Sequence, residues 1–513
     1  MKLASLRACA ALVLALCAWP ASAADVDVEQ LREATAKLIK LLVDQGVLTR
    51  EKADAVLGDL KAPPPAMASA AAAPARAASS GGTVRVPYVP EFVRKELKDE
   101  LRAELQAQAV REGWAGPGAV PEWVRGIEFA GDLRMRFQAD RFADGNAPAV
   151  NVAATNAARS LTLLNTSEDR ERFRFRGRFG LTATLDENWS GGLRLSTGNL
   201  TDPVSANQTL GTYNQRYVVA LDRAYIRYRY GDEVNVVTGR FGNPWYGTEL
   251  VWANDLSFDG VAAQWTPRLS DRVRGFATLA VLPIQEVELS SADKWLFGAQ
   301  VGATLAGSAH AMGGKVGVSY YYYKNIVGQT SPAGSSLKEF TAPQFTQKGN
   351  TYYNISSDPT RPLLGLASEY RLLNVTGQVD APVVADKRVV LVGDFVRNLG
   401  FNRATVSQRV GSDVEPKVNG YQVRLGFGDA DVSRRNQWQA FVGYRRVERD
   451  AVLDAFTDSD FRLGGTDARG YILGGSYGLG KNVAATLKLL SSDSISGPPL
   501  SIDVIQLDLN VRF

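Results

Sequence analysis

The sequence predicts an all-β transmembrane barrel of about 16 antiparallel strands, preceded by a short α-helical region in the periplasm. From about Arg125 onward, hydrophobic and polar residues alternate with a period of two, which is typical of strands with one apolar face. About sixteen such segments follow one another, joined alternately by short turns and long loops. Because a sheet satisfies its backbone in lipid only when it has no free edge, these strands are expected to close into a barrel.

The composition excludes several classes of protein. With 45% hydrophobic and 22% charged residues among 513, the chain is not disordered throughout. The formal net charge of +4 is not the balance of a nucleic-acid-binding protein. No segment reaches eighteen apolar residues, which excludes membrane-spanning helices. A single histidine, His310, and two cysteines within the first twenty residues predict no enzyme activity, no metal site and no cofactor.

Residues 1–23 are expected to be a signal peptide. Lys2 and Arg7 give a positively charged start, Ala8–Ala18 an apolar stretch, and Ala21–Ala23 an A-x-A cleavage site. A short buried helix is the alternative, but Pro20 ends the apolar stretch where cleavage is expected. The mature chain should therefore begin near Ala24, outside the cytoplasm.

Four regions are expected in the mature chain. Apolar residues at a/d-like spacing predict a helical hairpin or coiled coil over 24–60. An Ala/Pro-rich linker follows over 61–89, and an amphipathic helix leads into the barrel over 90–121. The barrel itself is expected over 122–513.

Alternation of apolar and polar residues occurs in membrane barrels and in soluble sandwiches alike. The number of strands and the lengths of their connections favour the membrane barrel. Asp186-Glu187, Gly231-Asp232 and Gly478–Gly480 read as tight turns, whereas Arg141–Asp169, Lys324–Gly365 and Arg397–Val418 read as long loops. The predicted strands cover 125–139, 170–185, 188–198, 219–230, 233–241, 258–266, 271–281, 295–305, 312–322, 366–378, 387–396, 419–427, 436–446, 468–477, 481–491 and 502–513. The last one ends in an aromatic residue, Phe513, which resembles the assembly signal of bacterial outer-membrane barrels.

Three stretches carry a resemblance to a known family. They are Pro90–Leu105 (PEFVRKELKDELRAEL), Gly113–Arg136 (GWAGPGAVPEWVRGIEFAGDLRMR) and Gly239–Val261 (GRFGNPWYGTELVWANDLSFDGV). Together they resemble the putative porin family of Gram-negative bacteria. The resemblance implies an outer-membrane diffusion channel and does not supply a solute.

An arginine ladder is the strongest candidate for a functional surface. Arginine occupies every second position of 170–178, and arginine at the membrane midplane costs about 2–4 kcal/mol on a lipid face. We therefore expect a basic wall lining the pore, which would attract anions. Alternatively, each arginine pairs with a carboxylate and only fills the interior. The expected wall comprises Arg134, Arg136, Arg172, Arg174, Arg176, Arg178, Arg194, Arg223, Arg227 and Arg229.

The loop Gly242–Ser257 is a candidate constriction. It is rich in aromatic and acidic residues and resembles the loop that folds inward to narrow a porin. The alternative is an extracellular loop anchored at the membrane surface by its aromatic rings. The candidate residues are Trp245, Glu249, Trp252, Asp255 and Asp259.

We therefore expect a passive outer-membrane porin for small hydrophilic solutes, with a preference for anions. The alternative is a structural anchor that reaches the cell wall through residues 26–112. Expected partners are outer-membrane lipid and lipopolysaccharide, the barrel assembly machinery, and further copies of the chain, most simply as a trimer. No nucleic-acid partner is expected.

Overall fold

The computed structural model describes residues 126–148, 150–151, 163–288, 290–308, 311–384 and 386–513. The predicted signal peptide (1–23), helical segment (24–60), linker (61–89) and amphipathic helix (90–121) lie outside the described residues. The barrel is therefore described by itself.

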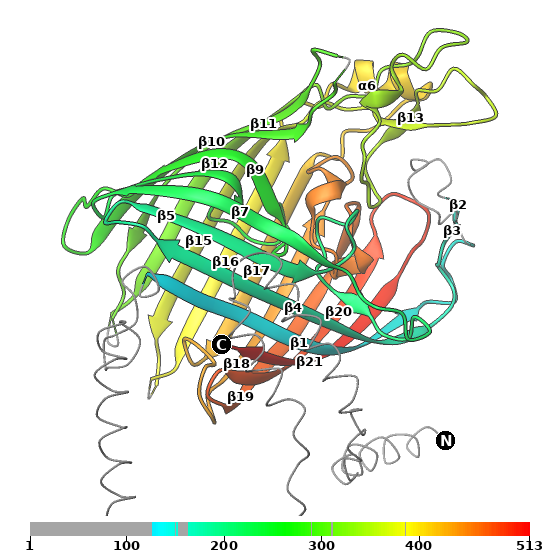
Figure 1. Ribbon diagram of the computed structural model, residues 1–513. Coiled ribbons are helices and arrows are strands. Elements are labelled where there is room, and N and C mark those ends of the chain that lie inside the picture. Colours follow the sequence, from blue (N-terminus) through cyan, green and yellow to red (C-terminus); the bar gives the residue numbers. More distant parts are fainter. Residues whose placement is uncertain (1–125, 149, 152–162, 289, 309–310, 385) are drawn as a thin grey trace, which may run out of the picture. The chain divides into compact units, whose positions relative to one another are not determined.

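Sixteen long strands of the described part form one closed antiparallel barrel (Figure 1). Each strand pairs with its neighbour in sequence, and β1 pairs with β21 from Asp132↔Arg512 to Phe142↔Ile502, which closes the ring. The predicted barrel of 16 antiparallel strands is confirmed. The strands are β1 (Ile127–Phe142), β4 (Arg170–Thr184), β5 (Trp189–Thr197), β7 (Val219–Tyr230), β8 (Val234–Gly242), β9 (Ser257–Trp265), β10 (Val273–Gln285), β11 (Lys294–Leu305), β12 (Gly313–Lys324), β15 (Arg371–Pro382), β16 (Arg388–Asn398), β17 (Asn419–Gly428), β18 (Trp438–Val447), β19 (Ala468–Gly480), β20 (Val483–Ser494) and β21 (Ile502–Arg512).

The longer loops gather at one end of the barrel, and five of them carry short elements of their own. These elements are β2 (Val150–Asn151), β3 (Leu163–Leu164), β6 (Gln208–Thr209), η1 (Glu339–Thr341), β13 (Tyr352–Asn354), β14 (Leu364–Leu366), α6 (Arg403–Val410), η2 (Asp454–Phe456) and η3 (Phe461–Leu463). Helix α6 begins where the Asn402 side chain accepts a hydrogen bond from the Thr405 amide, and it ends at Gly411 with φ 78°. None of the helices in the described ranges is long and apolar enough to span a membrane.

Most strand boundaries differ from the sequence-based expectation by a few residues, and two of these differences have an identifiable cause. The strand predicted at 366–378 is β15, which begins at Arg371, because Leu366 and Tyr370 are buried in the preceding loop rather than paired in the barrel. The turn predicted at Gly478–Gly480 lies within β19, where the pairing with β20 shifts register. In the first case, hydrophobic residues packed in a loop resemble the start of a strand in sequence. In the second case, a β-bulge resembles a turn.

The outward face of the barrel is apolar, as a lipid-facing surface requires. On β21, Leu507 is 52% exposed, whereas its neighbour Gln506 is fully buried on the inner side. The buried hydrophobic cluster lies where loops fold inside the barrel. It includes Leu250 of the β8–β9 loop (243–256), Tyr370 of the β12–β15 loop (325–370) and Phe461 of the β18–β19 loop (448–467). These loops therefore occupy the barrel interior, here called the lumen, and shape the candidate site.

Candidate functional site

Strand β4 carries the arginine ladder on its lumen side. Phe173 and Phe179 are exposed on the outer face, whereas the even-numbered residues Arg172 to Arg178 are partly buried. This division follows from the period-two geometry of a strand, since successive side chains point to opposite faces.

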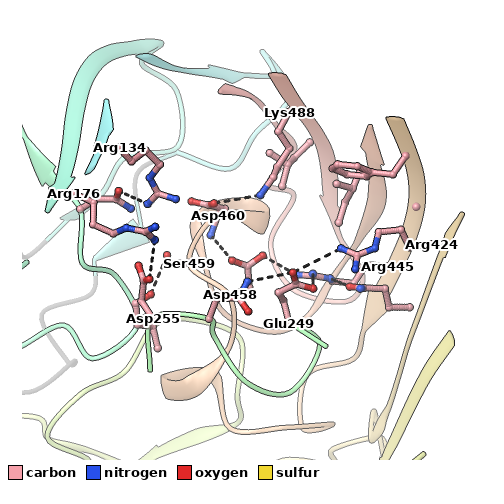
Figure 2. Close-up of a pocket in the computed structure, with 18 residues that line it drawn as sticks. Arg134, Arg176, Glu249, Asp255, Arg424, Arg445, Asp458, Ser459, Asp460 and Lys488 are labelled. Carbon is pink, nitrogen blue, oxygen red and sulfur yellow. Dashed lines mark hydrogen bonds and ion pairs between the residues drawn. The ribbon is translucent and has the colours of Figure 1, made fainter. Parts of the chain in front are cut away.

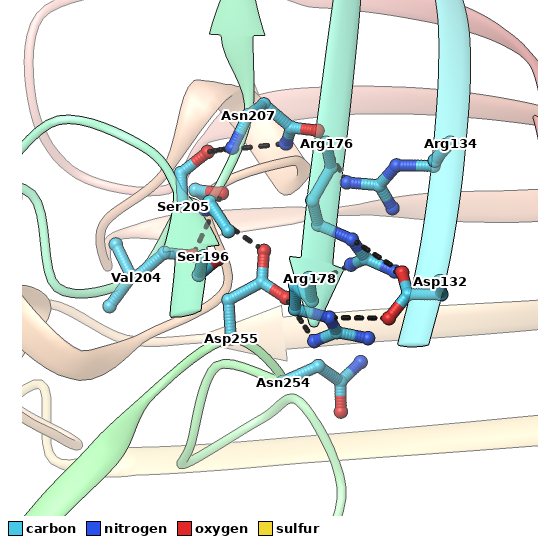
Figure 3. Close-up of polar contacts among 12 residues, drawn as sticks. Asp132, Arg134, Arg176, Arg178, Ser196, Val204, Ser205, Asn207, Asn254 and Asp255 are labelled. Atoms are coloured by element: carbon cyan, nitrogen blue, oxygen red, sulfur yellow. Dashed lines mark hydrogen bonds and ion pairs between the residues drawn. The ribbon is translucent and has the colours of Figure 1, made fainter. Parts of the chain in front are cut away.

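Three ladder arginines form ion pairs with carboxylates, and Figure 3 shows those of Arg176 and Arg178. Arg172 pairs with Asp140 of β1 at 2.7 Å. Arg176 and Arg178 share two carboxylates, Asp132 of β1 at 2.7 Å and Asp255 of the β8–β9 loop at 3.0 and 3.2 Å. Strand β4 itself has few carboxylates on its lumen side. The acidic partners of its arginines come from the neighbouring strand β1 and from the β8–β9 loop. Asp132 and Asp140 could have been found, because they lie on the same face of their strand as Arg134 and Arg136.

Other predicted wall residues also have partners. Arg136 is only 2% exposed, and its guanidinium bonds Asp508 of β21 at 2.7 Å and Asp460 of the β18–β19 loop at 3.0 Å. Arg194 of β5 pairs with Asp222 of β7. The register between β5 and β7 shifts beside Arg194. Such a β-bulge disturbs the regular alternation of side chains, which explains why strict alternation did not identify this partner.

Arg134, Arg174 and Arg223 differ, because their hydrogen-bond partners among the described residues are neutral. Arg134 donates to the Asn207 side-chain oxygen, and Arg174 donates to Gln138 at 3.2 Å. Arg223 donates to the Ser257 hydroxyl at 3.2 Å. Within the described residues, none of the three has a carboxylate oxygen within 4.0 Å. Like Arg227 and Arg229, these three arginines therefore have no directly paired carboxylate in the described part of the chain.

Two predicted wall residues lie away from this cluster. Arg227 and Arg229 are near the short-turn end of β7. Arg227 stacks over the Tyr225 ring at 5.1 Å, and Arg229 is exposed. The structure therefore does not bring these two arginines to the β8–β9 loop.

The β8–β9 loop packs into the lumen through its aromatic residues. The rings of Trp245 and Trp252 each lie edge-on to Tyr321 of β12, with centroids 5.2 Å apart. A Cβ at Gly298 of β11 would lie 2.5 Å from the Trp245 ring, so glycine is needed there to admit the indole. Trp245 and Trp252 are buried, which differs from an anchor on the membrane surface.

The acidic residues of this loop reach two opposite parts of the wall. Asp255 pairs with the β4 ladder, whereas Glu249 lies 3.8 Å from Arg424 of β17 and 3.9 Å from Arg445 of β18. Burial raises the pKa of Glu249, but the two guanidinium groups outweigh it and lower the pKa to about 2. Glu249 therefore stays ionised at neutral pH. Asp259 is not part of the loop: it lies on β9, its side chain is 53% exposed, and it pairs with Arg240 at 2.8 Å.

A second inward loop was not identified from the sequence. The β18–β19 loop places Asp458 3.0 Å from Arg445 and Asp460 3.7 Å from Lys488 of β20 (Figure 2). Asp460 also lies 3.0 Å from Arg136. Burial raises the pKa of Asp460, but the surrounding cations hold it well below its ordinary value. The sequence signal that could have identified this loop is the pair of carboxylates Asp458 and Asp460 within the 20-residue connection 448–467.

A cavity of about 130 Å³ lies between the two inward loops and the barrel wall. One part of its lining is charged and another part is apolar. The charged lining consists of Arg134, Arg176, Glu249, Asp255, Arg424, Arg445, Asp458, Asp460 and Lys488. The apolar lining consists of Val204, Phe441, Ile472 and Leu490.

The sequence of this charged barrel matches a known family. A sequence profile described as putative porin matches residues 32–513, which is most of the chain. The chain belongs to the putative porin family. This match confirms the family predicted from the sequence. It also supports the prediction that the chain is a porin-type channel of the outer membrane.

The chain is also similar to several solved structures. OprB of Pseudomonas putida is 14% identical, with a TM-score of 0.45 over 76% of this chain and 95% of that one. The channel DcaP of Acinetobacter baumannii and OmpF of Salmonella typhi, solved with daunomycin, are each 10% identical, with TM-scores of 0.40 over 75% of this chain and 97% of theirs. A comparison with curated proteins found no match.

Proposed function

We propose that this porin family member forms a water-filled channel for passive diffusion of small hydrophilic solutes and favours anions. One observation carries the proposal. The constriction carboxylates Asp132, Asp255, Asp458 and Asp460 all have cationic partners, whereas Arg134, Arg174 and Arg223 have neutral partners.

Uncompensated cations in a narrow lumen raise the local concentration of anions. Field lines are focused where low-dielectric walls surround an aqueous path, so a few charges produce a large potential. Rings of arginine and lysine favour anions in other pores for the same reason. The two inward loops narrow the path beside this wall, which brings a passing solute close to it.

Two measurements test the proposal. The purified chain in planar lipid bilayers should give discrete conductance steps. In liposome-swelling assays with solutes of matched size, an anionic solute should enter faster than a neutral one, and a cationic solute should enter slowest. Conductance without this order would contradict the anion preference. A chain that inserts without conducting would instead favour the anchor role through residues 26–112.

A further inference from the structure

We propose that the cavity between the two inward loops is a saturable binding site for small monocarboxylates with a compact apolar body. This deepens the proposed function and rests on it in one respect, since the solute must reach the lumen. The lining includes the Arg134 guanidinium and the apolar side chains of Phe441, Ile472 and Leu490.

The positive charge of the site belongs to Arg134, because the carboxylates that line the cavity pair with other cations. The acids Glu249, Asp255, Asp458 and Asp460 that line the cavity all have a cation within 4.0 Å. Arg134 lines the cavity, and its hydrogen-bond partner in the described part of the chain is the neutral Asn207 oxygen. The carboxylate of a ligand would give this guanidinium an ionised acceptor, and charge-assisted hydrogen bonds of this kind are stronger than those to neutral acceptors.

The apolar lining selects the body of the ligand. Ile472 and Leu490 are buried on the lumen side of β19 and β20, and Phe441 of β18 lies beside them. The Arg424 guanidinium sits 5.8 Å from the Phe441 ring centroid, at the border between the charged and apolar parts. A ligand with a carboxylate at one end and an apolar body at the other would fill both parts, and burial of its apolar surface would favour binding.

Size and charge exclude other solutes. A cavity of about 130 Å³ admits only a compact molecule. The lining holds five cationic and four anionic side chains, an excess of one positive charge, so a second negative charge on the ligand would have no cation left to pair with. A cationic ligand would have to displace a guanidinium from one of these carboxylates. The site therefore suits a monoanion better than a dianion or a cation.

Calorimetric titration of the full chain in detergent tests the site with benzoate as the probe. Benzoate should bind saturably, whereas acetate, which lacks the body, and benzyl alcohol, which lacks the charge, should bind at least about tenfold more weakly. Phthalate, with a second carboxylate, should also bind more weakly. Absence of saturable benzoate binding, or equal affinity for all four compounds, would overturn the proposal.

Variants separate the two parts of the site. Arg134→Gln should weaken benzoate and acetate alike by about tenfold or more, whereas Ile472→Thr should weaken benzoate and leave acetate unchanged. Arg268→Gln removes a charge at an exposed turn and should change neither affinity. If Arg134→Gln does not assemble, Arg134→Lys keeps the charge but cannot bind a carboxylate through two parallel hydrogen bonds, so it should also weaken benzoate. Unchanged benzoate affinity in the folded Arg134 variant would contradict the site.

Bilayer recordings distinguish failure of the site from failure of the channel. In potassium chloride the channel should conduct, and added benzoate should reduce the current in a saturable way. Conductance that benzoate does not alter, together with a flat titration, would contradict the site alone. Saturable binding by a chain that never conducts would contradict the channel and leave the site standing.

Discussion

Arg174 keeps its charge on the lumen side of β4 with two neutral partners, Gln138 at 3.2 Å and Ser205 at 3.5 Å. Its replacement therefore removes a charge without leaving a directly paired carboxylate. We expect Arg174→Ser to shift the reversal potential in a salt gradient toward cation preference. The shift should be largest at 0.1 M salt, where the Debye length is about 10 Å, and small at 1 M, where it is about 3 Å.

Arg268→Ser is the control for this experiment, because that arginine is exposed in a turn and pairs with Asp271. Its reversal potential should equal that of the parent chain at both salt concentrations. Identical reversal potentials for Arg174→Ser and the parent at 0.1 M salt would contradict a role of Arg174 in selectivity.

At the scale of single residues, the orientation of the ladder could be predicted and its pairing could not. The period-two alternation of β4 is a local property, so it places Arg172 and Arg178 on the lumen side from sequence alone. The partner Asp255 lies 77 residues from Arg178 in sequence, and Asp460 lies 324 residues from Arg136. Such pairs depend on how two loops fold inside the barrel, which no local pattern encodes.

At the scale of elements, Asp460 holds the β18–β19 loop to the barrel wall through Arg136 and Lys488. Asp460→Asn should release this contact. Breaking a buried ion pair costs about 3–5 kcal/mol, and the loss here should be at the lower end because Arg136 keeps Asp508. We expect a lower unfolding temperature in detergent and noisier single-channel currents.

Asp431→Asn is the matched control, since Asp431 is 64% exposed and lies 4.0 Å from Arg512. Exposed pairs contribute about 0–1 kcal/mol, so both measurements should stay at parent values. A quiet Asp460→Asn channel with an unchanged unfolding temperature would mean that this ion pair does not hold the loop.

The same loop contains a carboxyl group that responds to pH. Asp454 is fully buried, and burial raises its pKa to about 6 although the Tyr352 hydroxyl donates to it at 2.8 Å. Folding therefore favours the protonated form, and the stability of this contact should fall as pH rises from about 4 to about 6. The shift of roughly two pKa units corresponds to at most about 100-fold in local protection.

Amide hydrogen exchange of residues 448–467 tests this, corrected for the intrinsic effect of pH. The parent should be better protected near pH 4.5 than at pH 7.5, and Asp454→Asn should lose most of the difference. Asp450, whose pKa burial also raises, accounts for a remaining slope. Asp358→Asn is the control, because a hydrogen bond from Thr360 lowers the pKa of that exposed carboxyl. If Asp454→Asn leaves the pH dependence of protection unchanged, another group causes that dependence and the prediction for Asp454 is wrong.

At the scale of the whole molecule, β1 and β21 close the barrel within residues 127–512. A chain shortened to residues 122–513 should therefore fold in detergent and resist SDS until heated. Because the predicted coiled coil at 24–60 is removed, sedimentation should show fewer barrels per particle than the full chain. Failure to fold would mean that the N-terminal region is part of the barrel. An equal number of barrels per particle for the two chains would contradict association through residues 26–60.

The lumen wall carries three arginines without a directly paired carboxylate, Arg134, Arg174 and Arg223, and the reversal potential of the parent channel tests their effect on selectivity. The potential should be measured in a tenfold gradient of potassium chloride around 0.1 M, and again around 1 M. The account predicts anion preference at low salt that declines at high salt, because screening removes the field of Arg134, Arg174 and Arg223. Cation preference at low salt would contradict it.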